Sequence, residues 1–135
     1  MTVFTSMIKK IYGFSSSGET RLKRTYQKSL DDAGIREIVL GHAEKNIVDG
    51  DQMVVFNRFG DIFIAFVVEN ENGMYILSLI NNLMSIYDRF FSKVCELHFI
   101  YNFKETHLIL DNYIVNGKCI SSDALEVMKQ VDCLR

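Results

Sequence analysis

The fold of this chain is decided by residues 62–91, which read IFIAFVVENENGMYILSLINNLMSIYDRFF. The first seven of these residues are all apolar, which is typical of a strand in the middle of a sheet with both faces covered. Residues 70–73 carry the Asn and Gly residues of a turn. Apolar residues then recur at intervals of three and four, and this spacing predicts an amphipathic helix over residues 74–91.

Shorter elements lie on the N-terminal side of this stretch. Residues 7–14 and 20–26 flank a Ser/Gly turn and predict a β-hairpin. Residues 29–43 show helical spacing, and residues 52–56 predict a strand joined by a turn to the apolar strand that begins at residue 62. Two strands, a helix, at least two strands and then helices indicate an antiparallel sheet covered by helices, an α+β fold.

The C-terminal third is ambiguous. Residues 97–103 alternate like a strand, yet helical spacing also connects apolar and small residues across this region, namely Phe99, Phe103, Thr106, Leu110 and Tyr113. Periodicity alone leaves strand and helix open. Asn116 and Gly117 form a helix stop. A last short helix is expected to start near Ser122 or Asp123, with an apolar side made by Leu125, Met128 and Val131.

Composition limits the kind of protein. The 135 residues are 48% hydrophobic and 24% charged, with a net charge of −2, which predicts one compact domain over residues 1–135. No apolar run approaches the roughly 20 residues that cross a bilayer, and the start lacks the pattern of a secretory signal. Three cysteines without a C-x-x-C pair suggest neither a disulfide framework nor a zinc site, so we expect a reducing cytosol.

Charge is unevenly distributed along the chain. Residues 1–28 hold six Lys and Arg residues against one acid, Glu19, so the remainder is acidic. A basic segment can attract acidic peptides or phospholipid head groups. Alternatively, it is the solvated edge of a sheet, protected by its Lys and Arg residues.

The sequence does not support catalytic chemistry. Residues 13–20, GFSSSGET, differ from a phosphate-binding loop motif at one position. Glu19 replaces the Lys that this motif needs and would repel phosphates. His42, His98 and His107 are scattered, without the spacing of a metal or catalytic set. The aromatic residues lie among core-like positions in an acidic domain, which disfavours nucleic-acid binding. We therefore expect no enzyme, no metal and no cofactor.

Four stretches share a pattern with a known family. They are residues 18–26 (GETRLKRTY), residues 90–97 (FFSKVCEL), residues 101–111 (YNFKETHLILD), and Gly117 with the VMK at residues 127–129. Together they resemble the small (sigma) subunits of clathrin-adaptor complexes, over nearly the whole chain from about Met7. The spacing between VCEL and ILD, which matches without gaps, is the specific part of the resemblance.

The resemblance implies a longin-like fold, a five-stranded antiparallel sheet flanked by helices. It also implies a helix over residues 97–115 in place of a strand. Because that helix would be apolar nearly all round, we expect it to be buried in the core or against a partner. The implied function is a non-enzymatic subunit that joins a large subunit in a heterotetrameric adaptor linking cargo, membrane and clathrin. Such complexes act on the cytoplasmic side of coated vesicles or pits, or of Golgi and endosomal membranes.

The resemblance further implies a binding site for acidic dileucine signals, [DE]xxxL[LI], on cargo tails. Met84 and Val94 correspond to residues that line a pocket for the two leucines, and Arg21 corresponds to a basic residue toward the acidic end. Taken alone, the pattern favours Met84 and Val94 as ordinary core residues and Arg21 as a solvated edge residue, and only the resemblance raises the binding role to equal standing. Burying a Leu contributes roughly 1.5–3 kcal/mol and an exposed ion pair about 0–1 kcal/mol, so binding would be weak and depend on avidity.

Several positions depart from the family pattern. Met84 stands where Val is common, Lys93 replaces an Asn, and Glu19 replaces a basic residue and would oppose an acidic ligand. We assign structural roles to Glu96 and Asp111. The alternatives are the zeta subunit of the COPI coat, which shares the fold, and a free-standing longin-type trafficking regulator.

Overall fold

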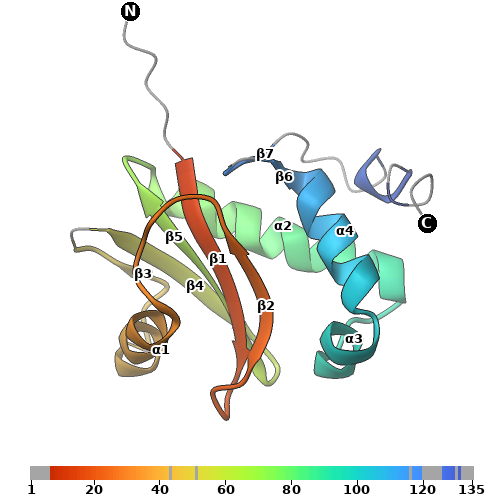
Figure 1. Cartoon of the computed structure of the whole chain (residues 1–135), viewed down its shortest axis with the longest axis horizontal. Coiled ribbons are helices and arrows are strands. Elements are labelled where there is room, and N and C mark those ends of the chain that lie inside the picture. Colours follow the sequence, from red (N-terminus) through yellow and green to blue (C-terminus); the bar gives the residue numbers. More distant parts are fainter. Residues whose placement is uncertain are drawn as a thin grey trace, which may run out of the picture.

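The computed structural model describes residues 7–42, 44–50, 52–115, 117–119, 126–129 and 131. Its main sheet has five antiparallel strands in the order β2-β1-β5-β4-β3 (Figure 1). These strands are β1 (Met7–Ser15), β2 (Thr20–Thr25), β3 (Ile47–Val48), β4 (Met53–Phe59) and β5 (Ile62–Glu69). The helices are α1 (Asp32–Gly41), α2 (Gly73–Phe91), α3 (Glu96–Tyr101) and α4 (Phe103–Tyr113). A second, two-stranded sheet pairs β6 (Ile114–Val115) with β7 (Lys118–Cys119). The expected α+β class with a five-stranded antiparallel sheet is confirmed.

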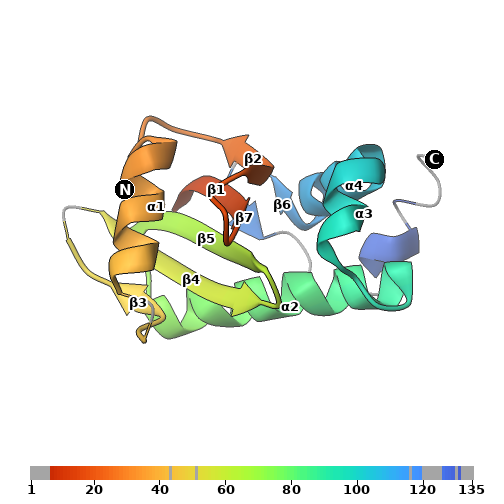
Figure 2. The ribbon, with the colours of Figure 1, turned by 90° about the horizontal axis from the view of Figure 1, so that it is seen from below.

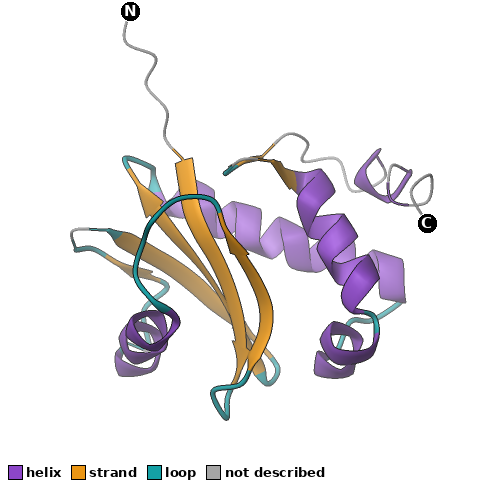
Figure 3. Cartoon of the chain, in the orientation of Figure 1, coloured by secondary structure: helices purple, strands orange, loops and turns teal. Residues whose placement is uncertain are grey.

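The two faces of the sheet are covered by different helices. Figure 2 shows α1 on one face and α2 along the other, and Figure 3 shows the strands enclosed between helices. In β5, Ile62, Ile64 and Phe66 belong to the core under α2, whereas Phe63 and Ala65 belong to the core under α1. Every β5 side chain from residue 62 to residue 68 is buried. The strand that is apolar on both sides therefore lies at the centre of the sheet, as predicted.

Helix α2 has clear start and stop signals. The side chain of Asn72 accepts hydrogen bonds from the backbone N–H groups of Met74 (2.9 Å) and Tyr75 (3.3 Å), two donors that the helix itself leaves free. The helix ends at Ser92, whose φ of 64° lies in the left-handed region. Both ends agree with the predicted helix to within a residue.

Residues 97–115 differ from the single helix that the resemblance implied. Helix is the correct state, but the chain breaks at Asn102 (φ −111°, ψ 42°) into α3 and α4, and then enters β6. The expectation that this region is buried is correct only for part of it. Phe99 and the inner face of α4 are covered, whereas Leu97 (56% exposed), Tyr101 (79%) and Phe103 (60%) face outward. α3 packs against β2 and α4, and its Phe99 and His98 contact the Tyr87 and Phe91 rings of α2. A helix of six residues buries only the side chains on the faces that make these contacts.

The remaining predictions are confirmed or lie outside the described residues. The β1–β2 hairpin and α1 form as expected, with Asp31 capping α1, and β3 is an additional short strand that the pattern did not indicate. The predicted start of the last helix falls outside the described residues, as does Leu125. Residues 126–129 are helical, and Val127 and Val131 are buried.

Candidate functional site

A cavity of about 390 Å³ opens between the β4–β5 turn and the segment that joins α2 to α3. Its apolar wall is made by five side chains from four parts of the chain, namely Phe59, Ile62, Met84, Val94 and Phe99. Its charged lining is made by Asp61, Asp88, Lys93 and Glu96. The cavity lies on the face of the sheet that α2 covers, because Ile62 and Met84 belong to the core on that side. An apolar hollow with a charged rim can hold aliphatic side chains of a ligand whose backbone remains in solvent.

Met84 and Val94 both line this cavity, as the resemblance implied. Met84 projects from α2 and is 5% exposed, so the same side chain also packs in the core. Val94 is half-buried and lies in the segment after α2. The two alternatives considered for Met84, core residue and pocket residue, are therefore both true of its position.

Two backbone N–H groups of the segment that carries Val94 donate hydrogen bonds to side chains of the flanking helices. The Val94 backbone N–H donates to the Asp88 carboxylate on α2 (3.0 Å). The Cys95 N–H donates to His98 Nδ1 on α3 (3.0 Å). Between α2 and these bonds the chain turns through Ser92 and Lys93, with φ values of 64° and 155°. These two bonds hold Val94 and Cys95 against α2 and α3 at the wall of the cavity.

Arg21 does not line this cavity. It lies behind Glu96, which does. Its Nε donates to Glu96 (3.1 Å), which is itself part of the lining, and its Nη2 donates to Glu19 (2.9 Å). The pKa of the Arg21 guanidinium is raised by the hydrogen bond to Glu19 and, further, by that to Glu96. The structure thus places Met84 and Val94 in one cavity and Arg21 in the neighbouring groove between β2 and α3; the Arg21–Glu96 ion pair and Phe99, which lines both, connect the two.

Sequence reasoning missed the contributions of Phe59, Ile62 and Phe99. These residues carry no chemical signal of a site, since apolar positions at strand ends and in helices are normally core. Glu96 was assigned a structural role, and its ion pair with Arg21 spans 75 positions of the chain. Only the folded chain brings the two residues together.

A second groove, of about 400 Å³, runs between β2 and the helices α3 and α4. Arg24 bridges this region by donating from Nε and Nη2 to the two carboxylate oxygens of Asp111 on α4 (2.8 and 2.9 Å). Ile100 and Phe103 form its apolar side. They belong to a group of four exposed apolar residues, Leu97, Ile100, Tyr101 and Phe103, which we call the α3–α4 patch.

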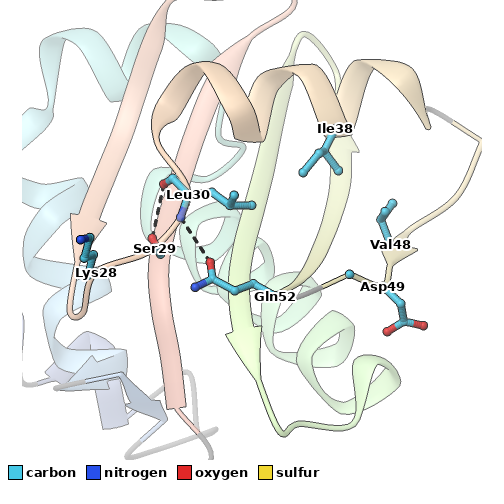
Figure 4. A pocket seen from close by; sticks show the side chains of 8 residues that line it. Lys28, Ser29, Leu30, Ile38, Val48, Asp49 and Gln52 are labelled. Atoms are coloured by element: carbon cyan, nitrogen blue, oxygen red, sulfur yellow. Dashed lines mark hydrogen bonds between the residues drawn. The ribbon is translucent and has the colours of Figure 1, made fainter.

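A third pocket, of about 520 Å³, lies on the α1 side of the sheet (Figure 4). Leu30, Ile38 and Val48 point into it, with Lys28 and Asp49 on opposite sides. The Leu30 N–H donates to the Gln52 side chain (3.2 Å), which ties the start of α1 to β4. This pocket contains none of the predicted site residues.

The described residues contain neither a metal site nor a membrane-spanning helix. In that part of the chain, no group of three or more His, Cys, Asp or Glu side chains is placed to hold a metal ion. Nor does any described helix combine the length and apolar character needed to cross a bilayer.

The structure thus combines a helix-covered antiparallel sheet with an apolar cavity beside the end of α2. Residues 7–135 match the family described as clathrin adaptor complex small chain, so the protein belongs to that family. The resemblance to sigma subunits is thereby confirmed.

Individual relatives come from several adaptor complexes. The chain is 27% identical to the human AP-1 complex subunit sigma-3 over 136 residues, covering 93% of this chain and 88% of that protein. It is 29% identical to the AP-2 complex subunit sigma of Schizosaccharomyces pombe over 139 residues (95% and 97% covered). It is 26% identical to the AP-3 complex subunit sigma of Arabidopsis thaliana over 142 residues (93% and 85% covered). A chain in a homology model of the full-length AP-3 complex in a stretched open conformation shares the fold, with a TM-score of 0.69, 20% identity, and 95% and 93% coverage.

Proposed function

We propose that this chain is a sigma-type small subunit of a heterotetrameric adaptor complex and acts in vesicle-mediated protein transport, without a catalytic role. The observation that carries this proposal is the family match over residues 7–135. The relatives described above are all sigma subunits, which favours a sigma subunit over the zeta type of the COPI coat and over a free-standing longin regulator. They belong to three complexes at similar identity, so the proposal does not select one complex. The subunit would work on the cytoplasmic side of coated vesicle membranes.

The proposed partner is the large chain of such a complex. The α3–α4 patch supports this part of the proposal, because four large apolar side chains are exposed within seven residues of sequence. Exposed apolar patches of this kind mark interaction surfaces in soluble proteins. Co-purification of a stoichiometric large chain from cell extracts is the expected result, whereas a stable monomer without a partner would contradict the proposal.

We further propose that the cavity at Met84 and Val94 receives the leucine pair of a dileucine sorting signal on cargo tails. The support is the apolar wall formed by Ile62, Met84 and Val94 beside an open charged rim. Each buried Leu would contribute roughly 1.5–3 kcal/mol, much of which offsets the cost of association. The resemblance assigns the acidic residue of the signal to Arg21, whose guanidinium is here already bound by Glu19 and Glu96.

The cavity is tested with Val94→Asp in the assembled complex. A carboxylate in the apolar wall should weaken capture of a Leu-Leu peptide by about ten-fold or more, because the leucines would then face an unpaired charge. Val115→Asp makes the same substitution at an exposed position on β6 and should leave capture unchanged. A Leu-Leu to Ala-Ala peptide measures the background. Equal capture by both variants and the unaltered complex would exclude this cavity as the cargo site.

A further inference from the structure

The charged side chains that line the cavity differ in what they already bind. The acidic ones have partners within the chain, which are Arg21 for Glu96 (3.1 Å), the Val94 backbone N–H for Asp88 (3.0 Å) and Arg58 for Asp61 (4.0 Å). Lys93 also lines the cavity and is exposed, but its ammonium makes no ion pair or hydrogen bond within the described part of the chain. This cation is therefore available to an anionic group of a ligand.

Lys93 lies beside the proposed leucine site and apart from Arg21. It directly precedes Val94 in the segment between α2 and α3 and lines the cavity but not the groove, whereas Arg21 lines the groove but not the cavity. The resemblance places the acidic residue of the signal near Arg21, four positions before the leucines, or roughly 13 Å along an extended peptide. A ligand that runs from the groove into the cavity therefore reaches the side of Lys93 only with its leucine pair and the residue that follows.

We infer that Lys93 binds a carboxylate immediately after the leucine pair, either an acidic side chain or the C-terminal carboxylate of the cargo tail. The inference rests on the proposed cargo function and adds a second charged contact to it. An ammonium is a compact charge with three rotatable donors on a flexible stem, so it accepts a carboxylate of either origin. Because the family pattern has an uncharged Asn at this position, the preference belongs to chains that carry Lys here.

The inference is tested on the assembled complex with peptides that share one acidic residue and one Leu-Leu pair and carry Glu, Gln or Lys directly after the pair. We expect the Glu peptide to bind about two- to five-fold tighter than the Gln peptide, the range of an exposed ion pair, and the Lys peptide to bind weakest. The differences should shrink as salt is raised, because exposed charges are screened.

Two further peptides separate the two sources of the carboxylate. Both end at the Leu-Leu pair, one with a free carboxylate and the other with an amide. A preference for the free carboxylate, or for Glu in the first set, supports the inference and identifies which carboxylate is bound. Equal binding within both sets by the unaltered complex would overturn it.

Substitutions at Lys93 connect the preference to this side chain. Lys93→Asn should abolish it and leave Leu-Leu capture in place, since Asn is uncharged and is enriched at positive φ, which is 155° here. Lys93→Glu should reverse the order of the Glu and Lys peptides. Lys28→Asn is the matched control, because it removes the same charge at an exposed position on the α1 side of the sheet (Figure 4) and should preserve the order.

The outcomes separate this inference from the cargo function. A Lys93→Asn complex that keeps the full preference would overturn the inference, while the loss of binding by Ala-Ala peptides would still support the leucine cavity. If Ala-Ala peptides bind as well as Leu-Leu peptides throughout, the cargo function fails and the inference fails with it.

Discussion

Met84 and Arg21 illustrate how much the role of a residue depends on its neighbours. Met84 fills the core beneath α2 and lines the cavity with the same side chain, so its position on an apolar helix face is compatible with both roles. Arg21 is basic at the expected place, but Glu19 and Glu96 neutralise it. The type and position of a residue in the sequence identify a candidate for a binding site. The electrostatic environment in the folded chain decides what that residue can bind.

At the residue scale, we expect His107 to make the stability of the folded chain depend on pH. Its side chain is buried on α4, its ring nitrogen Nδ1 lies 2.9 Å from the Phe103 carbonyl, and burial lowers the pKa of the imidazole. The neutral form is favoured in the folded state, although Asp111 on the same helix opposes this shift and Arg24 of β2 adds to it. Protonation then costs stability, since the unfolded chain takes up the proton more readily.

We expect the chain to lose stability as the pH falls through about 6.5, the pKa of an unfolded His, and to recover it above that value. His107→Gln should remove this part of the pH dependence, whereas His42→Gln, at an exposed position, should retain it. Urea denaturation at pH 7 and pH 5 measures both variants. Parallel pH profiles for the unaltered chain and His107→Gln would show that the imidazole contributes nothing.

At the scale of elements, an apolar run explains the burial of β5, but apolar content does not explain the burial of α3 and α4. β5 is apolar at successive positions because one set of its side chains packs under α2 and the other under α1. α3 and α4 carry a similar density of apolar residues, yet part of that surface is exposed. Apolar content therefore indicates burial in a strand flanked on both sides, but not in a short helix at the end of the sheet.

Gly13 allows close packing between β1 and its neighbours. A Cβ at this position would lie 2.9 Å from Ile64 Cδ1 and 3.0 Å from Leu22 Cβ, both on buried residues. Gly13→Ala should therefore destabilise the chain by about 1–3 kcal/mol through overpacking.

Gly41→Ala is the matched control, because nothing lies within 4 Å of a Cβ added at the end of α1. This variant should be neutral, or more stable by up to about 1 kcal/mol, as is usual for Gly to Ala in a helix. Thermal or urea denaturation compares the two. Equal stabilities would show that the sheet yields at Gly13 without cost.

At the scale of the molecule, four of the eight large apolar side chains that are exposed among the described residues lie together at the α3–α4 end. Tyr101 and Phe103 are the most exposed of the four residues in the α3–α4 patch, and they lie at the junction of the two helices, well apart from α1 (Figure 1). Apolar surface of this kind is costly in water and becomes favourable when a partner covers it.

The double variant Tyr101→Asp with Phe103→Asp should reduce co-purification of the large chain by about ten-fold or more, the effect of losing interface hot spots. The small chain itself should remain folded, because both side chains already face solvent. Leu40→Asp, an exposed position on α1, controls for the added charge. Undiminished co-purification of the double variant would assign the large-chain interface to another surface.

The sequence by itself determined the α+β class, the order of the main elements, the central position of the apolar strand and the family. These features depend on local periodicity and on motifs that are contiguous in the chain. The tertiary structure alone decided the break at Asn102, the exposure of the α3–α4 patch, the walls of the cavity and the pairing of Arg21 with Glu96. Each of these depends on which residues meet across large separations in sequence, and packing and Coulomb forces act on distances in space.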